Sequence, residues 1–343
     1  MRFVWGVLAC IIGAAAVVLL VPSAFPMLKP YFLTTPLAQL LAVRTALAIG
    51  LAVLAIVLIF VALLRRILAN RGRIAGALGA LLMVVALLHG GITLSRGIDS
   101  APTMHDDAGV TENSAGNGAI TVMNYNTLGG QTTPEQIARL VIENGVDVVS
   151  LPETSTQRGR EVVQALGRSG LSFQQFDTDT SVYAAEFQST VLLISQALGT
   201  YNKVAVGDFP ASVVVAEPVS PGAPTFIGTH PIAPVPRLID QWREAQAAVY
   251  GLCGEYDNAI ISGDFNSTVD HQALFGGTCK DAAIEARGGS LGTWPAALAS
   301  VLSVPIDRVL HTGAFYQGES ATVVNVGDSD HRGIIVRLTP SAS

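Results

Sequence analysis

The stretch AIISGDFNST, residues 259–268, places a carboxylate and a carboxamide two residues apart, directly after an apolar run. The run is typical of a buried strand, and Gly263 interrupts the pattern. If the chain stays extended past Gly263, Asp264 and Asn266 project to the same side, because side chains alternate along a strand. A carboxylate at such a strand end can manage a reacting water, and an amide can orient it. The alternative is a strand followed by an ordinary Asx-type turn, which uses the same residue types.

Similar polar residues recur at or beside the ends of other strand-like runs. Each one alone is explained as a solvated loop residue, but the ordered recurrence indicates a functional site. The residues are Asn126, Glu153, His230, Asp264, Asn266, Asp307, Asp330 and His331.

The elements that must position these residues are mostly strands. Strand-like runs begin near residues 120, 146, 190, 212, 225, 260, 309, 322 and 333, and helical patterns cover residues 134–143, 159–166 and 236–250. Many of the strands are continuous apolar runs, which is typical of strands buried on both faces. We therefore expect two packed sheets with helices on their outer faces, an α+β or α/β sandwich.

The first hundred residues have a different composition. No acidic residue precedes Asp99, whereas Lys and Arg occur eight times before it. Three uncharged runs there, residues 3–21, 45–64 and 74–95, each have about the twenty residues needed to span a bilayer. Buried helices of a soluble core would need shorter runs and charged outer faces. The sequence therefore predicts three transmembrane helices.

The distribution of basic residues predicts the orientation. The short link between the second and third runs carries Arg65, Arg66, Arg71 and Arg73, so this link should be cytoplasmic. The third helix then leads out of the cytoplasm, and everything after Arg96 is extracytoplasmic. If the first run is instead a cleaved signal peptide, two helices remain and the C-terminal part is still outside.

We thus divide the chain into a transmembrane anchor (residues 1–96), a flexible polar linker (97–118) and one compact domain (119–343). An external compartment permits Cys253 and Cys279 to pair, and two free thiols are the alternative.

The ordered motifs resemble the endonuclease/exonuclease/phosphatase superfamily, the metal-dependent phosphoesterases related to DNase I, abasic-site endonucleases and neutral sphingomyelinases. The resemblance covers residues 120–338 and rests on MNYNTLGG, DVVSLPET, GTHP, SGDFN, PIDRVL and SDHRGI. Pro152 stands where the family usually has Gln. The resemblance implies a four-layer DNase I-like sandwich and a hydrolase acting on phosphate esters.

The resemblance and the chemistry of phosphate esters together imply a metal site. A hard cation neutralises the charge that develops on the phosphate, and Mg²⁺ prefers carboxylate and water ligands. We expect Mg²⁺, with Mn²⁺ as the alternative, to be held mainly by Glu153, with Asn126 beside it and Asp330 contributing.

The remaining residues are expected to act on protons and phosphate. Asp264 would position or deprotonate the attacking water, and Asn266 would orient that water or a phosphate oxygen. His331, held by Asp307, would donate to the phosphoryl oxygens. His230 would protonate the leaving group or bind phosphate. Whether Asp264 or His331 is the base stays open at this point.

The charge of the domain bears on its substrate. From residue 119 onward there are 12 Lys and Arg against 22 Asp and Glu, a net charge of −10, with no basic cluster. Duplex-binding proteins typically use a basic surface, so we expect no stable nucleic-acid partner. A membrane tether instead raises the effective concentration of membrane substrates.

The predicted three-helix layout and the motif LGTWPA ahead of PIDRVL resemble the actinobacterial membrane phosphatases of the VanJ teicoplanin-resistance type. This resemblance implies a lipid-linked phosphate or pyrophosphate substrate, similar to undecaprenyl pyrophosphate. A cell-surface nuclease is the alternative. A non-catalytic membrane-anchored sensor is a third reading, disfavoured because all eight polar residues are present.

Overall fold

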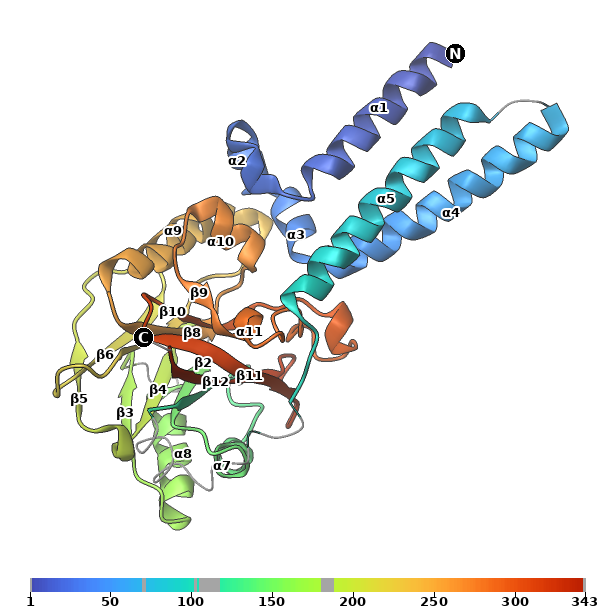
Figure 1. The fold of residues 1–343 in the computed structure, drawn as a ribbon. Coiled ribbons are helices and arrows are strands. Elements are labelled where there is room, and N and C mark those ends of the chain that lie inside the picture. The colour runs from blue at the N-terminus through green and yellow to red at the C-terminus, as the bar shows by residue number, and fades with distance from the viewer. Residues whose placement is uncertain (1, 70–71, 102–103, 105–117, 180–187, 342–343) are drawn as a thin grey trace. The chain divides into compact units, whose positions relative to one another are not determined.

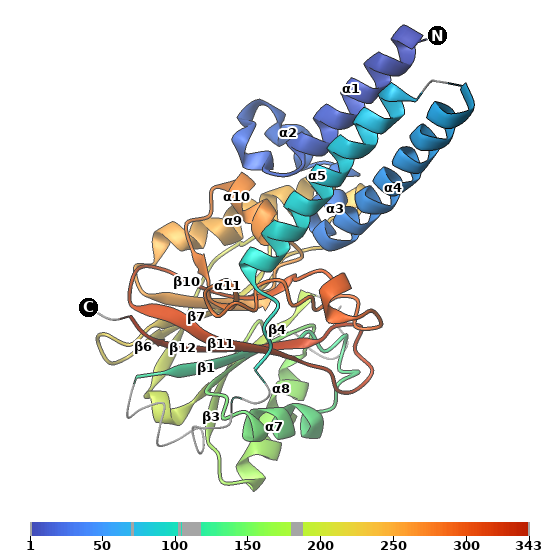
Figure 2. The ribbon, with the colours of Figure 1, turned by 45° about the vertical axis from the view of Figure 1, so that its right-hand side comes forward.

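The computed structural model of the chain describes residues 2–69, 72–101, 104, 118–179 and 188–341 (Figures 1 and 2). The chain divides into two compact units, Met1–Ser95 and Arg96–Ser343. Each unit has its own buried core, the first helical and the second mixed.

The first unit is built from long apolar helices. They are α1 (Arg2–Val18), α4 (Arg44–Ala69) and α5 (Arg73–Arg96), with the short helices α2 (Lys29–Phe32) and α3 (Leu37–Ala42) between the first two. An added Cβ on Gly79 of α5 would lie 2.9 Å from Ile59 Cγ1 and 3.0 Å from the Ala55 carbonyl oxygen, both on α4. A small residue therefore lets these two helices approach closely, as is common between membrane helices.

Two of the three predicted membrane spans have the required length. The segments Arg44–Leu68 and Arg73–Arg96 are long and apolar enough to cross a membrane, whereas the first run contains only a shorter apolar helix, Gly6–Val18. The first helix, α1, has 17 residues and ends before Pro22. At about 1.5 Å per residue it is shorter than a hydrocarbon core of about 30 Å. Of the three predicted spans, two are thus candidate membrane helices by length and composition, and the first is not confirmed.

The second unit contains two six-stranded sheets. The first sheet has the order β11-β12-β1-β2-β4-β3 and the second has the order β5-β6-β7-β8-β10-β9. Within each sheet one neighbouring pair is parallel, β1 with β2 and β7 with β8. The strands of the first sheet are β1 (Ile120–Asn124), β2 (Val148–Pro152), β3 (Phe173–Asp177), β4 (Thr190–Ser195), β11 (Tyr316–Val324) and β12 (Gly333–Pro340). Those of the second are β5 (Tyr201–Val204), β6 (Ser212–Pro218), β7 (Thr225–His230), β8 (Ala259–Asp264), β9 (Lys280–Asp281) and β10 (Asp307–His311).

Helices cover the outer face of each sheet, so the unit is the expected mixed α/β sandwich (Figure 1). Against the first sheet lie α7 (Pro134–Glu143) and α8 (Thr156–Arg168), with the intervening core formed by residues such as Met123, Ile137 and Leu166. Against the second lie α9 (Ile239–Glu255) and α10 (Val269–Phe275), and a four-residue helix, α11 (Ala282–Glu285), follows β9. A third apolar cluster, from strands of both sheets and including Val122 and Ile260, fills the space between the sheets.

Two features outside the sheets add to the second unit. A disulfide joins Cys253 of α9 to Cys279, just before β9, which resolves the alternative that the sequence left open. At the start of the unit, the Asp99 amide donates to the Arg287 carbonyl. Residues 97–101 and Met104 of the predicted linker thus pack onto the domain, and Gly118 directly precedes it, while residues 102–103 and 105–117 lie outside the described residues.

Candidate active site

The polar residues singled out in the sequence meet at one end of the sandwich because of the sheet topology. The parallel strands β1 and β2 end there in the first sheet, as β7 and β8 do in the second. Strand β10 runs antiparallel to β8 and begins there, with Asp307 opposite Asp264. At this end of the sandwich, a hydrogen bond of 2.8 Å from Asn124 Nδ2 of β1 to Asp307 Oδ1 of β10 connects the two sheets.

Asp264 lies at the centre of this cluster. Its Oδ2 accepts a hydrogen bond from Asn126 Nδ2 at 3.1 Å and lies 3.7 Å from both His230 Nε2 and His331 Nε2. Its Oδ1 accepts from the Asn266 amide at 2.8 Å. One buried carboxylate oxygen therefore faces an amide and two imidazoles that come from three different strand ends.

Asn266 differs from the extended geometry expected of it. Strand β8 ends at Asp264, and Asn266 has a left-handed backbone with φ of 47°, which Asn tolerates better than most residues. The backbone N–H of Asn266 closes an Asx-type turn on Asp264, which is the alternative that the sequence had offered to a chain extended through Asn266. The side chain nevertheless reaches the cluster, where Nδ2 donates to the Pro231 carbonyl at 3.0 Å and lies 3.4 Å from His230 Nε2.

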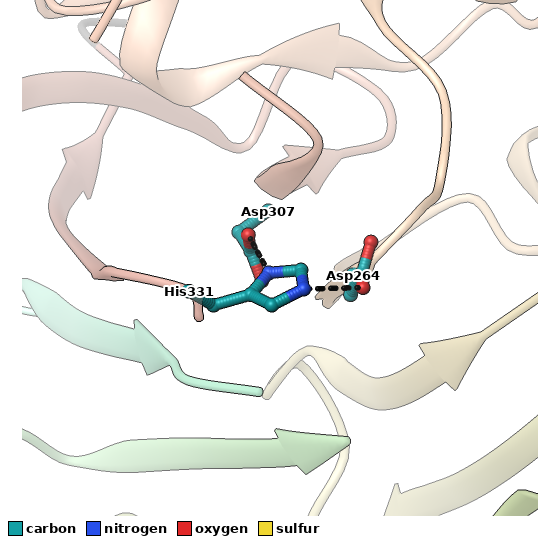
Figure 3. A group of neighbouring side chains, drawn as sticks. All are labelled: Asp264, Asp307 and His331. Carbon is teal, nitrogen blue, oxygen red and sulfur yellow. Dashed lines mark hydrogen bonds and ion pairs between the residues drawn. The ribbon is translucent and has the colours of Figure 1, made fainter. Parts of the chain in front are cut away.

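His331 and Asp307 form a buried pair (Figure 3). His331 Nδ1 lies 2.8 Å from Asp307 Oδ2, so the imidazole directs Nε2 towards Asp264. Burial lowers the pKa of His331, but the charges of Asp307 and Asp264 outweigh it and raise that pKa to about 10. Burial also raises the pKa of Asp307, against the charge of His331 and together with that of Asp264. The pair therefore stabilises an imidazolium beside Asp264.

Glu153 lies on the more accessible side of the cluster. Its side chain is 18% exposed, and Oε1 lies 2.9 Å from Asn126 Nδ2 and 3.7 Å from His230 Nε2. The residue follows β2 with a φ of 55°, and its amide donates to the Ser189 carbonyl. Two non-glycine residues of this cluster, Glu153 and Asn266, thus have left-handed backbones. Local backbone strain of this kind is common at functional sites.

Asp330 occupies a more exposed position than the other predicted ligands. Its side chain is 48% exposed, Oδ1 lies 3.9 Å from His331 Nε2, and Oδ2 accepts from Trp294 Nε1 at 2.9 Å. The preceding residue, Ser329, donates its hydroxyl to the Asn126 carbonyl at 2.7 Å. The chain segment that carries Asp330 is thus fixed beside Asn126.

The donor chemistry fits a hard divalent cation. Carboxylates and an amide dominate the cluster, and these oxygen donors suit Mg²⁺ or Mn²⁺. Among the described residues, Asp264, Asp307 and His331 form a group with ligand atoms within 4.8 Å of one another. Asp307 is a poor ligand in that group, because its two oxygens already accept from Asn124 and His331. Glu153, which is partly exposed, is better placed to bind a cation from solution.

The structure adds residues that the sequence reasoning missed. Asn124 supports Asp307, and the only signal for it was its position two residues before Asn126 on the same strand face. Arg308 is buried behind the site, where it donates to Asp281 at 2.9 Å and to the Tyr250 hydroxyl at 3.0 Å. Arg308 directly follows Asp307 in a strand-like run, and this position could have indicated that its side chain is buried. A buried guanidinium needs a carboxylate partner.

The fold and the site define the class of protein to which the chain belongs. The family model described as the endonuclease/exonuclease/phosphatase family matches residues 123–331, so the chain is a member of this family. The comparison with curated proteins found no match.

Several solved structures are similar to the chain at low sequence identity. An endonuclease/exonuclease/phosphatase from Beutenbergia cavernae is 15% identical with a TM-score of 0.47, covering 65% of this chain and 72% of its own. A 3′ phosphatase from Neisseria bound to a product DNA hairpin is 15% identical with a TM-score of 0.48, covering 63% and 98%. A mannosyl-6-phosphatase from Bacteroides thetaiotaomicron is 17% identical with a TM-score of 0.45, covering 64% and 99%.

Proposed function

We propose that the chain is a membrane-anchored, metal-dependent phosphoesterase that hydrolyses a lipid-linked phosphate ester or pyrophosphate outside the cytoplasm. The observation that carries the hydrolytic part is the convergence of Asn126, His230 and His331 on one oxygen of Asp264, with Glu153 at the accessible edge. A buried carboxylate between two imidazoles is suited to proton transfer, which a hydrolase requires and a non-catalytic binding domain does not.

The metal site in this proposal lies at the accessible edge of the cluster. Glu153 would be the principal ligand, with Asn126 beside it and Asp330 contributing from the neighbouring segment. A bound Mg²⁺ or Mn²⁺ would neutralise charge on the phosphoryl oxygens. The hydrogen bond of 2.9 Å from Asn126 Nδ2 to Glu153 Oε1 holds the Glu153 carboxylate in place.

The buried part of the cluster would handle protons. Asp264 would take a proton from the attacking water, and Asn266 would orient that water. Asp307 accepts from His331 Nδ1 and so keeps Nε2 directed into the site, where it would donate to the phosphoryl oxygens. His230, 3.7 Å from both Glu153 and Asp264, would supply a proton to the leaving group.

Three observations support a membrane location and an extracytoplasmic site. Two helices have the length and apolarity of membrane spans, and large apolar side chains such as Phe60 and Leu87 are exposed on them. The basic residues of the link between these helices, Arg65, Arg66, Arg71 and Arg73, favour a cytoplasmic position for that link. The disulfide between Cys253 and Cys279 is typical of an oxidising compartment.

The lipid-linked substrate is proposed from the membrane helices and from the charge of the catalytic unit. A net charge of −10 after residue 118 gives little attraction for a nucleic-acid backbone. The resemblance of the LGTWPA motif to VanJ-type phosphatases agrees with this choice. A substrate held in the same membrane would meet the enzyme at high effective concentration.

The test is to assay the purified full chain in detergent on a long-chain polyprenyl pyrophosphate and on plasmid DNA, with Mg²⁺ and with EDTA. We expect phosphate release from the lipid with Mg²⁺, none with EDTA, and intact plasmid in both conditions. Plasmid cleavage without phosphate release would replace the proposal by a cell-surface nuclease. Inactivity on both substrates, with the fold intact, would favour a non-catalytic module.

A further inference from the structure

A loop of unusual composition borders the candidate active site. From Leu291 to Ile306 the sequence LGTWPAALASVLSVPI contains no charged residue. Four large apolar side chains in this loop are exposed, Trp294 at 41%, Leu298 at 47%, Val301 at 41% and Leu302 at 39%. We call these four residues the apolar rim. Elsewhere in the described part of the second unit, exposed large apolar residues are separated from one another along the sequence.

Hydrogen bonds within the loop and from Arg332 fix its backbone. The amides of Thr293 and Trp294 donate to the Val304 carbonyl, so the two ends of the loop are paired. Arg332 of the SDHRGI motif donates to the Ala296 carbonyl at 2.7 Å, to the Ser303 hydroxyl at 3.1 Å and also to the Leu298 carbonyl. With its backbone groups satisfied in this way, the loop presents apolar side chains to solvent at a fixed position.

One residue of the apolar rim, Trp294, contacts the catalytic cluster. Trp294 donates its indole N–H to Asp330 Oδ2 at 2.9 Å, and the Ala296 amide donates to the Asp330 carbonyl at 2.7 Å. At the same end of the loop, the Thr293 hydroxyl accepts from the Asp307 amide at 3.2 Å. The indole N–H of Trp294 thus faces the site, while part of its apolar ring is exposed to solvent. This arrangement suits a ligand whose polar headgroup is joined to an apolar chain.

We propose that the apolar rim binds the hydrocarbon chain of the substrate while its phosphate occupies the catalytic cluster. This inference rests on the proposed function and adds where the lipid chain is bound. Several large exposed apolar side chains within one short loop indicate an interaction site. The two membrane-capable helices make a membrane lipid the available apolar ligand. The contact of Trp294 with Asp330 requires the apolar chain to start near the phosphate, as it does in a polyprenyl pyrophosphate.

The experiment compares two substrates with the same headgroup, a long-chain polyprenyl pyrophosphate and isopentenyl pyrophosphate, at one detergent concentration. Full-length wild-type protein is compared with the double variant Leu298→Ser/Leu302→Ser. The matched control is Val219→Ser, which removes an apolar residue that is 57% exposed outside the loop. Because burial of apolar surface favours binding, loss of the two leucine contacts should lower the long-to-short ratio of kcat/KM at least about tenfold. The control should keep the wild-type ratio.

Binding without turnover provides a second readout. In an Asp264→Asn background, the Kd for the long-chain pyrophosphate should rise at least about tenfold when Leu298→Ser/Leu302→Ser is added. Equal losses on both substrates, or an unchanged ratio with unchanged Kd, would overturn the inference while lipid hydrolysis by the wild type still stands. The same comparison is repeated with the protein in lipid vesicles. If the double variant loses activity on the long-chain substrate in vesicles but not in detergent, the apolar rim contacts the bilayer surface, and binding of the substrate chain is overturned. Absence of any binding or hydrolysis of the long-chain substrate by wild-type protein would remove the proposed function as well.

Discussion

Asp264 and Glu153 occupy the buried and the accessible sides of one site, and this difference in position separates their proposed roles. Asp264 is almost fully buried and accepts hydrogen bonds from Asn126 and Asn266. Glu153 keeps part of its side chain in solvent, although it contacts the same Asn126. A carboxylate that must admit a hydrated cation needs that exposure, because Mg²⁺ usually keeps several of its waters.

Glu153→Gln should therefore weaken metal binding with little effect on folding. The substitution removes one negative charge but keeps the size of the side chain. We expect the Mg²⁺ titration of phosphoesterase activity to shift to at least about tenfold higher concentration, with Tm nearly unchanged. Glu161→Gln, on the exposed face of α8, is the control. A wild-type Mg²⁺ dependence in Glu153→Gln would assign the principal ligand elsewhere.

The pair of His331 and Asp307 should make the metal-free protein sensitive to alkali. The pKa of His331 is about 10 in the folded protein against an ordinary value of 6.5. Its contribution to the free energy of unfolding is therefore fully present below about pH 6.5 and is lost as the pH rises towards 10. Denaturant unfolding in EDTA should show this decline for the wild type. Asp307→Asn, which removes the main charge that raises the pKa, should flatten it, and an identical decline in both proteins would contradict the assignment.

The positions of Asp264 and His230 in the site depend on the close approach of the neighbouring strands β7 and β8. Gly263 of β8 lies against Thr229 of β7, and an added Cβ would come within 1.9 Å of the Thr229 carbonyl oxygen. The next residue along each strand is a site residue, Asp264 on β8 and His230 on β7. A side chain at Gly263 would therefore push apart the two strands that bring these residues together.

Gly263→Ala should lower both stability and activity. Overpacking of this kind typically costs about 1–3 kcal/mol, and the displaced strand ends should reduce kcat as well. Gly251→Ala in α9 is the matched control, since its nearest neighbour for a Cβ is the Glu255 side chain at 4.0 Å. That control should be neutral or slightly stabilising, because Gly is unfavourable within helices. Wild-type stability and activity in Gly263→Ala would contradict the close-approach argument.

Sequence patterns predicted the buried strands and the helices with clear start signals. The helix predicted at residues 134–143 coincides with α7, which has Pro134 in its first turn and a capping box from Thr133 and Gln136. The strands β3 and β5 were missed because FQQFD and YNKV carry polar residues and lack an apolar run. Helix α10 was missed because its seven residues are too few to show a helical period.

The sequence indicated which polar residues lie near one another better than it indicated their geometry. The ordered motifs named the residues that meet around Asp264, since each motif ends or begins a strand at the same sheet edge. The sequence could not show all the contacts that hold the turn at Asn266, because some of them come from α9, outside the motif. Trp242 Nε1 of α9 donates to the Asn266 carbonyl at 3.1 Å, and Gln246 Nε2 donates to the Phe265 carbonyl at 2.5 Å. Contacts between residues so far apart in the sequence have no local signal.

For the whole molecule, the proposal requires the catalytic unit to lie on the outer side of the membrane. Protease added to intact protoplasts should release a fragment of the size expected for cleavage after residue 101. The cytoplasmic link with Arg65 and Arg71 should stay protected until the membrane is permeabilised. Protection of the catalytic unit in intact protoplasts would contradict the proposed orientation.

The central claim is that the cluster around Asp264 is a hydrolytic centre, and the rate constant of the Asp264→Asn variant tests it most directly. The full-length protein in detergent, with Mg²⁺ and a long-chain polyprenyl pyrophosphate, should show kcat at least about a hundredfold below wild type, because general-base contributions are about 10²–10⁴-fold. KM should hardly change, since Asn preserves the shape of the side chain and can still accept from the backbone N–H of Asn266. An Asp264→Asn protein with wild-type kcat would contradict the account, and Asp264 would then be only the first residue of an ordinary turn.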